Sequence, residues 1–246
     1  MILNVVLKMI LRSWWRNKVF FLVSVASLAL GLACTNLLMT YFVHEHGLEG
    51  RNPDRDRMVF LRQDDPMTEG KRVAFAGAEI PPQLKQSYAE VEDFLRLGKL
   101  DLLYCKVNEQ KVKGDFKMLS ADTTLTSFFD YRTEEGSLSQ VLCQPGKVAL
   151  SEACARRLFG GKQAVGKQVE AHFRFGEVRT YEVAAVLKKR EQSLLQFDML
   201  IAHDPDFFWG GLTLLKLTPG TDAGHLADKL NEDKVPTLMP GQTKYY

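Results

Sequence analysis

The chain has 246 residues, of which 46% are hydrophobic and 25% are charged, a composition typical of a globular protein with a buried core. Lys8, Arg12, Arg16 and Lys18 precede the first acidic residue, and the rest of the chain holds 28 basic residues (32 minus 4) against 30 acidic ones. A nucleic-acid-binding protein needs basic residues gathered on one face, so this balance argues against that class.

A long apolar run follows the four cations. Val19–Val43 holds 25 residues without a charged side chain, enough to cross a hydrocarbon core of roughly 30 Å. Three interpretations compete: a cleaved signal peptide, a lipoprotein signal ending at Cys34, or a permanent anchor. The apolar character continues from Cys34 to Val43, and Gly31-Leu32 reverses the usual order before a lipidated cysteine. The run therefore predicts a transmembrane helix over residues 19–43.

The flanks of this run predict its orientation. The basic residues lie on its N-terminal side, so the positive-inside rule puts the N-terminus in the cytoplasm and residues from about 44 onward outside. Residues 1–18 carry apolar side chains at helical spacing, with the basic ones on the other side. This pattern predicts an amphipathic helix in the inner interface, and the alternative is a longer transmembrane helix. Residues 44–57 are polar, contain Pro53 and are predicted to be a connector.

Residues 58–246 alternate short strand and helix signals. Strands are predicted at residues 58–63, 72–77, 100–107, 110–122, 146–151, 168–189 (a hairpin around Gly176), 197–202 and 210–220. Helices or turns are predicted at residues 83–98, 123–131, 152–160 and from 222 to about 231. The first helix has apolar residues at helical spacing and would end at Gly98. The third would be capped by Ser151 and stopped by Gly160-Gly161, and the last would be capped by Thr221 or Asp222. Strands 100–107 and 110–122 would be joined at Asn108-Glu109. This order predicts an α+β fold, with a mixed sheet in two lobes.

The cysteines carry no motif. Cys105, Cys143 and Cys154 follow the apolar run, and no C-x-x-C pair occurs. An odd number of cysteines beyond the membrane argues against a disulfide framework, so free thiols are favoured.

One stretch imitates a nucleotide-binding motif. GKQAVGKQ, residues 161–168, satisfies G-x-x-x-x-G-K, but Gln168 replaces the Ser or Thr that holds magnesium. It also follows a predicted helix, whereas a phosphate-binding loop follows a strand. Nucleotide binding is therefore not expected.

No catalytic, cofactor-binding or metal-binding residues are predicted. His44-Glu45-His46 with Glu49 resembles a metal cluster, but alternate residues of a helix place the two rings on different faces. The other histidines stand far apart, in no nucleophile context: His172, His203 and His225. The acidic clusters are interpreted as solvated surface: Asp64-Asp65, Glu90/Glu92/Asp93 and Glu134-Glu135. Acid–base catalysis is the minor alternative for three loop acids, Asp198, Asp204 and Asp206.

Five stretches, in order, resemble the MacB-like, FtsX-type permeases of ABC transporters. They are LKMILRSWWRNKVFFLVSVASLALGLA, NPDRDRMVFLR, IPPQLKQSYAEVEDFLRL, SFFDYRTEEGSLSQVL and KVALSEACARRLFGGKQAVGKQV. The last is the most specific, since it is similar to the family pattern VVISExxAxxLFGxxxxxGKxI. It would also place Gly166-Lys167 in a turn between a helix and a strand.

The resemblance implies a single-pass protein of the bacterial inner membrane, with a MacB-like periplasmic core domain over residues 58–246. It implies a cytoplasmic ABC ATPase on a separate chain, a homodimer or heterodimer of permease subunits, and a peptide, lipid or lipoprotein client. It implies no cofactor and no enzymatic activity of this chain.

Members of this family continue into three further transmembrane helices, whereas this sequence stops at Lys244-Tyr245-Tyr246. We therefore expect a fragment of a permease, a truncated product or a stand-alone relative. The alternative function is a membrane-anchored periplasmic binding or adaptor protein that acts without an ATPase. An anchored hydrolase ranks last because no nucleophile was found.

Overall fold

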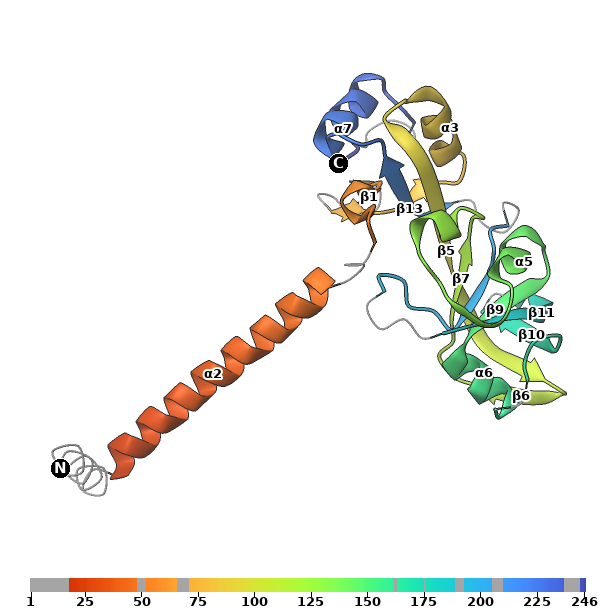
Figure 1. The fold of residues 1–246 in the computed structure, drawn as a ribbon. Helices are drawn as coiled ribbons and strands as arrows, with labels where there is room; N and C mark the ends of the chain where they lie inside the picture. Colours follow the sequence, from red (N-terminus) through yellow and green to blue (C-terminus); the bar gives the residue numbers. More distant parts are fainter. Residues whose placement is uncertain are drawn as a thin grey trace. The chain divides into compact units, whose positions relative to one another are not determined.

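The computed structural model describes residues 18–47, 52–65, 71–161, 163–174, 176–188, 193–204, 210–236 and 244–246. The chain divides into two compact units, Met1–Gly50 and Arg51–Tyr246 (Figure 1). We call the second unit the core domain. The predicted interfacial helix lies almost entirely outside the described residues.

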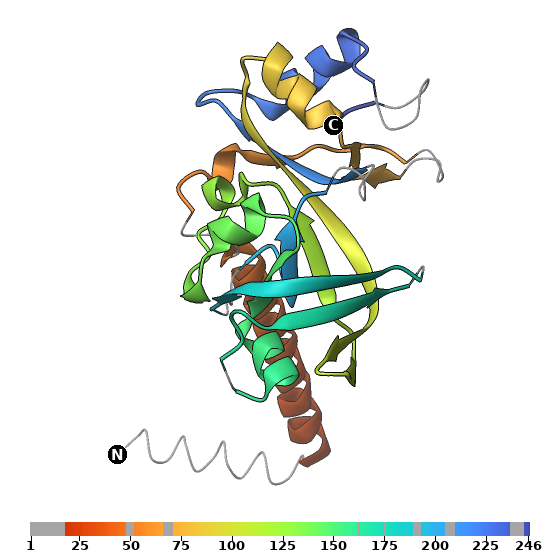
Figure 2. The ribbon, with the colours of Figure 1, turned by 90° about the vertical axis from the view of Figure 1, so that its right-hand side faces the viewer.

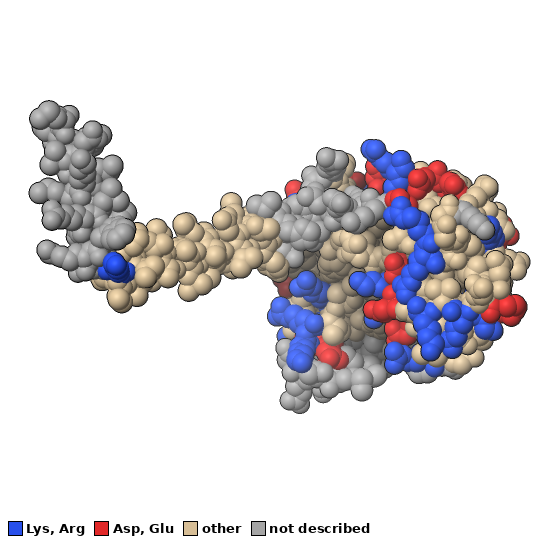
Figure 3. Space-filling view, turned by 90° about the horizontal axis from the view of Figure 1, so that it is seen from below, with Lys and Arg blue, Asp and Glu red and all other residues tan. Residues whose placement is uncertain are grey.

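The described part of the first unit is one helix, α2 (Lys18–Gly47). Its segment Lys18–Phe42 has a mean hydropathy of 2.0 and none of it is buried within the protein. After Lys18, the segment up to Phe42 has no Lys, Arg, Asp or Glu, and it is drawn in tan (Figure 3). Thr35 satisfies its hydroxyl inside the helix by donating to the Gly31 carbonyl oxygen at 2.9 Å. By length and composition, α2 can span a membrane.

The first lobe of the core domain packs two helices on a small sheet. Its elements are η1 (Arg55–Arg57), β1 (Met58–Phe60), β2 (Gln63–Asp64), β3 (Arg72–Val73), β4 (Ala76–Gly77), α3 (Ile80–Ser87), the start of β5 (Val91–Val107), β13 (Gly210–Leu217) and α7 (Ala223–Glu232). Strand β13 pairs antiparallel with β1, with β4 and with the first half of β5. A buried cluster that includes Leu84, Leu215 and Leu226 joins both helices to this sheet.

The second lobe is built on a closed ring of strands. Its elements are the rest of β5, β6 (Gln110–Lys113), β7 (Lys117–Ala121), α4 (Leu125–Phe128), β8 (Thr133–Gly136), α5 (Leu138–Cys143), β9 (Lys147–Ser151), α6 (Glu152–Phe159), β10 (Gln168–Phe173), β11 (Val178–Leu187) and β12 (Met199–Ala202). Successive pairing runs β5-β10-β11-β9-β12-β7 and returns to β5. Two of these pairings, β11 with β9 and β12 with β7, are parallel. The α+β class and the mixed sheet are thus confirmed.

Strand β5 connects the two lobes. It is 17 residues long and runs from the helices α3 and α7 into the second lobe (Figures 1 and 2). At Leu97 it changes neighbours, since this residue pairs both with Leu212 of β13 and with Ala121 of β7. One continuous strand therefore runs through both lobes.

Local signals in the sequence explain many of the boundaries. Asn108 and Glu109 both have positive φ, 48° and 63°, as a two-residue hairpin turn between β5 and β6 requires. Ser151 caps α6 by accepting the Cys154 N–H at 3.2 Å, and Gly160 ends it in the left-handed region. Asp222 caps α7 by accepting the His225 N–H at 2.8 Å.

The helix predicted over residues 83–98 is confirmed up to Ser87 and wrong beyond it. The helix α3 ends at Ser87, and Val91 onward is strand β5. Both faces of this part of β5 are covered: Val91 joins the core of the first lobe, whereas Leu95 joins the cluster around α4 and α5. A strand buried on both faces loses its alternating pattern, and its apolar residues then fall at helical spacing by coincidence.

Candidate functional site

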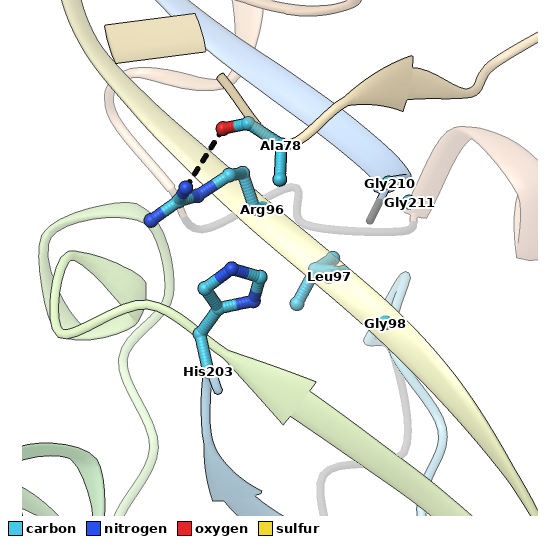
Figure 4. A pocket seen from close by; sticks show the side chains of 7 residues that line it. All are labelled: Ala78, Arg96, Leu97, Gly98, His203, Gly210 and Gly211. Carbon is cyan, nitrogen blue, oxygen red and sulfur yellow. Dashed lines mark hydrogen bonds between the residues drawn. The ribbon is translucent and has the colours of Figure 1, made fainter. Parts of the chain in front are cut away.

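The junction between the lobes is organised around Arg96 of β5. Its guanidinium contacts the Asp122 carboxylate twice, with Nη2 to Oδ1 at 2.7 Å and Nε to Oδ2 at 2.9 Å. The backbone N–H of Arg96 donates to the same carboxylate at 2.8 Å. Nη1 donates to the Ala78 carbonyl oxygen at 2.8 Å, just before α3 (Figure 4). One side chain therefore ties the first lobe to the end of β7.

His203 lies beside this ion pair at the end of β12 (Figure 4). Its backbone N–H donates to the Ala121 carbonyl oxygen at 2.8 Å, which sets the ring next to Arg96. Burial lowers the pKa of His203, and the charge of Arg96 lowers it further, while Asp122 and Asp204 oppose this shift. The ring is therefore held towards its neutral form.

Glycines line the same depression because the backbones approach closely there. A Cβ on Gly211 would lie 2.4 Å from the Leu97 carbonyl oxygen, and one on Gly210 would lie 2.7 Å from that of Ala76. The space between Ala78, Arg96, His203 and the glycines leaves no room for a water molecule. This junction is consequently a packed contact and not a preformed ligand pocket.

The chemistry of this junction is that of a structural polar network. The residues that line it contribute no Ser, Cys or Lys that could act as a nucleophile. Within the described ranges, no group of three His, Cys, Asp or Glu side chains is arranged to hold a metal ion. That the chain has no catalytic residue stays a prediction.

The false phosphate-binding loop is a helix end followed by a turn. Gly160 and Gly161 both have positive φ after α6, and the Gly166 N–H donates to the Val183 carbonyl oxygen at 2.8 Å. Lys167 lies over the ring of Phe159, with Nζ 5.0 Å from the ring centre. The structure places Gly166 and Lys167 in a turn between helix α6 and strand β10, as the family resemblance implied.

The histidines stay apart in the structure. His172 of β10 stacks on Tyr104 with ring centres 4.2 Å apart and contacts Glu170. His225 lies in the first turn of α7, and His203 lies at the lobe junction. The side chains of His44-Glu45-His46 and Glu49 lie outside the described residues, so the interpretation of this cluster stays a prediction.

The loop acids have structural partners. Asp198 accepts the Lys117 N–H at 2.9 Å, and Asp204 pairs with Arg179 at 3.0 Å. Asp64 lies 3.4 Å from the Lys244 N–H and 3.4 Å from the Tyr246 hydroxyl. Glu134 and Glu135 are exposed on β8, as expected for solvated surface, and Asp206 lies outside the described residues.

The acidic cluster Glu90/Glu92/Asp93, which the sequence suggested to be solvated surface, forms ion pairs with other elements of the first lobe. Glu90 pairs with Lys229 of α7 at 2.6 Å, and Asp93 pairs with Lys85 of α3 at 2.8 Å. Glu92 contacts Arg57 and lies 3.5 Å from Lys216. Sequence reasoning missed these pairs, and also Arg96 with Asp122, because each joins residues far apart in the chain with no local pattern.

The cysteines are free thiols: Cys34, Cys105, Cys143 and Cys154. Cys105 and Cys154 are buried in the second lobe, and burial raises the pKa of both thiols, that of Cys105 to about 12. Cys143, at the end of α5, is exposed.

By class, the protein is an α+β domain that follows a helix long and apolar enough to span a membrane. The MacB-like periplasmic core domain model matches residues 21–233, which includes most of α2 and nearly all of the core domain. The chain therefore belongs to the MacB-like periplasmic core domain family.

Solved structures share the fold. A domain assigned to a permease protein of Porphyromonas gingivalis superposes with a TM-score of 0.63 at 18% identity, covering 78% of this chain and 90% of that one. The periplasmic region of MacB from Actinobacillus actinomycetemcomitans gives 0.52 at 11% identity, covering 77% and 85%. The extracellular domain of the ABC-type transporter YknZ from Gram-positive bacteria gives 0.53 at 14% identity, covering 76% and 98%. No curated protein matches the chain.

Proposed function

We propose that this chain is a non-catalytic permease subunit of a MacB/FtsX-type ABC transporter, in which a separate cytoplasmic ATPase drives the movement. The observation that carries this proposal is that one family model covers both the apolar helix and the core domain. The chain would then supply a membrane helix and a periplasmic lever, and the ATPase would supply the energy. A peptide, a lipid or a lipoprotein is the proposed client.

The proposed topology follows from charge and length. The cations Lys8, Arg12, Arg16 and Lys18 precede the span, and the positive-inside rule puts them in the cytoplasm. Residues 1–18 would lie at the inner interface, residues 19–43 would cross the membrane, residues 44–57 would connect, and residues 58–246 would form the periplasmic core domain. The membrane would be the inner membrane of a bacterium.

The path of the chain through the core domain supports a lever. The first residues of the core domain lead into β2, and Tyr245 bridges to Gln63 in that same strand. The Tyr246 N–H donates to the Arg62 carbonyl oxygen at 3.0 Å, and Tyr246 stacks on Arg72. Tyr245 and Tyr246 are therefore attached to the first lobe, close in the chain to β1, and would move with it in the proposed lever.

The second candidate is a membrane-anchored periplasmic adaptor that works without an ATPase. The observation in its favour is that the lobe junction is tightly packed around Arg96, as suits a rigid binding module. In this case, the exposed surface of the core domain would bind its partner with no energy input.

Co-purification distinguishes the two functions. The full chain, tagged at its C-terminus, would be co-expressed with the ABC ATPase encoded nearest to it in its genome and purified in mild detergent. The permease proposal predicts a stoichiometric complex whose ATP hydrolysis differs from that of the ATPase alone. Absence of a complex with that ATPase, together with native folding of the core domain, would favour the adaptor.

A further inference from the structure

A short extended segment of the first lobe lies along one edge of β2. Residues 244–246, which we call the latch segment, run antiparallel to β2, with Tyr245 opposite Gln63. A backbone hydrogen bond joins the segment to β2 on each side of this pair. The Lys244 carbonyl oxygen accepts one at 3.2 Å, and the Tyr246 N–H donates the other at 3.0 Å. Because β3 pairs with the other edge of β2, the latch segment is a third strand of this small sheet.

An asparagine side chain takes the place of a further strand on the other side of the latch segment. Oδ1 of Asn231, in α7, accepts the Tyr245 N–H at 2.8 Å, and Nδ2 donates to the Tyr245 carbonyl oxygen at 3.1 Å. Two backbone groups of the segment therefore bond to β2 and two bond to Asn231. This is the main-chain pairing by which proteins bind an extended peptide through strand addition.

Tyr245 fills the buried part of this arrangement. Its residue is 3% exposed, and it lies in the same hydrophobic cluster as Leu61 and Leu230. Its hydroxyl group donates to the Pro236 carbonyl oxygen at 2.6 Å. A buried tyrosine needs such a partner for its hydroxyl group, so both the ring and the polar end are accommodated.

Tyr246 lies on the surface of the same arrangement. It is 42% exposed, and the guanidinium carbon of Arg72, in β3, lies 3.6 Å from the centre of its ring. A guanidinium over an aromatic face is attractive. An aromatic side chain is therefore favoured at this second position as well.

We infer that β2 and Asn231 form a recognition site for an extended peptide that carries a tyrosine followed by a second aromatic residue, and that the latch segment occupies this site in cis. Main-chain pairing supplies affinity, and the buried side chain supplies selectivity. A separate peptide of this chemistry would compete with the latch segment for the same groups. All of these contacts lie within the first lobe, so the site and the proposed function can fail separately.

A variant without the buried ring makes the site available to a peptide in solution. Tyr245→Ala removes the ring and leaves β2, Asn231 and Arg72 in place. The full chain in detergent micelles would be mixed with the acetylated peptide TKYY, which repeats residues 243–246. The peptide is used at about 2 mM, because intramolecular segments act at effective concentrations in the millimolar range. Saturation-transfer difference NMR then detects binding through the tyrosine rings of the peptide.

The recognition site predicts a signal with Y245A that is several-fold above the signal with the parent protein, whose site is filled. The peptide TKAY, which lacks the first tyrosine, should give no such increase. Adding Asn231→Ala to Y245A should abolish the increase, because the peptide backbone then loses both bonds on that side.

Tyr88 offers a matched control for the loss of a buried ring. It belongs to the same hydrophobic cluster, is 8% exposed and donates its hydroxyl group to Asp233 at 2.8 Å. Tyr88→Ala opens the cluster but leaves the backbone pairs of the latch segment in place, so TKYY should bind no better than to the parent. Equal signals with Y88A and Y245A would overturn the inference, since the peptide would then only fill a cavity.

Folding of each variant is checked by circular dichroism before the peptide is added. If Y245A does not fold, Tyr245→Leu decides the question, because leucine keeps part of the buried volume but lacks the ring and the hydroxyl group. A folded variant that gives no signal above the parent, or that binds TKAY as well as TKYY, would equally overturn the inference.

Discussion

Arg96 and Asp122 form a doubly hydrogen-bonded ion pair between the middle of β5 and the end of β7, at the point where β5 passes from one lobe to the other. The side chains are 20% and 10% exposed, and both oxygens of Asp122 are engaged by Arg96. Bidentate geometry and low exposure make this pair stronger than a surface salt bridge. It holds the two lobes in one fixed relation.

Replacing Arg96 by Met should lower the free energy of unfolding substantially. The substitution leaves the Asp122 carboxylate without its partner, and losing one member of a fully buried pair costs roughly 3–5 kcal/mol. Because both groups keep some contact with water, we expect about 2 kcal/mol, measured by urea unfolding of the full chain in detergent. Arg156→Met removes an exposed pair with Glu152 and should cost less than about 0.5 kcal/mol. Equal losses of unfolding free energy in the two variants would show that the Arg96–Asp122 pair contributes no more than an exposed ion pair.

His203 should make the core domain less stable as the pH falls. Burial, followed by the charge of Arg96, lowers the pKa of the folded histidine below its ordinary value of 6.5. Below pH 6.5 the unfolded chain then binds more protons than the folded chain, so the free energy of unfolding falls with falling pH. Carboxyl groups whose pKa is lowered in the folded domain, such as Glu90, reduce the free energy of unfolding only below about pH 4.5.

The measurement is urea unfolding at a series of pH values from 7.5 to about 5. The variant His203→Gln should flatten the slope in this range, since glutamine does not titrate. An unchanged slope in the His203 variant would mean that another group titrates.

Replacing Gly136 by alanine is predicted to destabilise the core domain, because the added Cβ would collide with the backbone. It has a φ of 77°, and a Cβ there would lie 2.0 Å from the Ala184 carbonyl oxygen across the β8–β11 pairing. Gly146 has a similar φ of 80°, but a Cβ there would meet no atom within 4 Å. Gly146→Ala should therefore cost only the strain of the left-handed backbone, about 1–2 kcal/mol.

Gly136→Ala adds a collision with rigid backbone and should cost several kcal/mol more, or displace β8. Thermal unfolding followed by circular dichroism compares the two variants directly. Similar melting temperatures would imply that β8 shifts freely, and that its pairing with β11 matters little for stability.

The sequence predicted well those features that depend on neighbouring residues. Ser151 as a helix cap, Gly160 as a helix end and the hairpin at Asn108-Glu109 each follow from the conformational preferences of one or two residues. The apolar run from Val19 to Val43 is also a local signal. The resemblance to a known family placed a mixed-sheet core domain after it.

The failures arise where distant residues determine the structure. Val91 to Leu95 form a strand because β13, more than a hundred residues later in the chain, supplies its partner and because both faces are covered. Strand β8 and helix α5 were not predicted, since β8 has four exposed residues and only its pairing with β11 defines it. The ion pair of Lys216 with Asp54 has the same origin, because these two residues meet only in the folded domain.

The native cysteines test the proposed topology without any engineered label. A membrane-impermeant maleimide added to intact spheroplasts should label the exposed Cys143. Cys105 and Cys154 should stay unreactive until the chain is unfolded, because both are buried and burial raises the pKa of each thiol, that of Cys105 to about 12. Mass spectrometry identifies the modified residue, and Cys143→Ser should abolish labelling of the folded protein. Labelling of Cys143 only after the membrane is permeabilised would place the core domain in the cytoplasm and would reverse the orientation proposed from the basic flank.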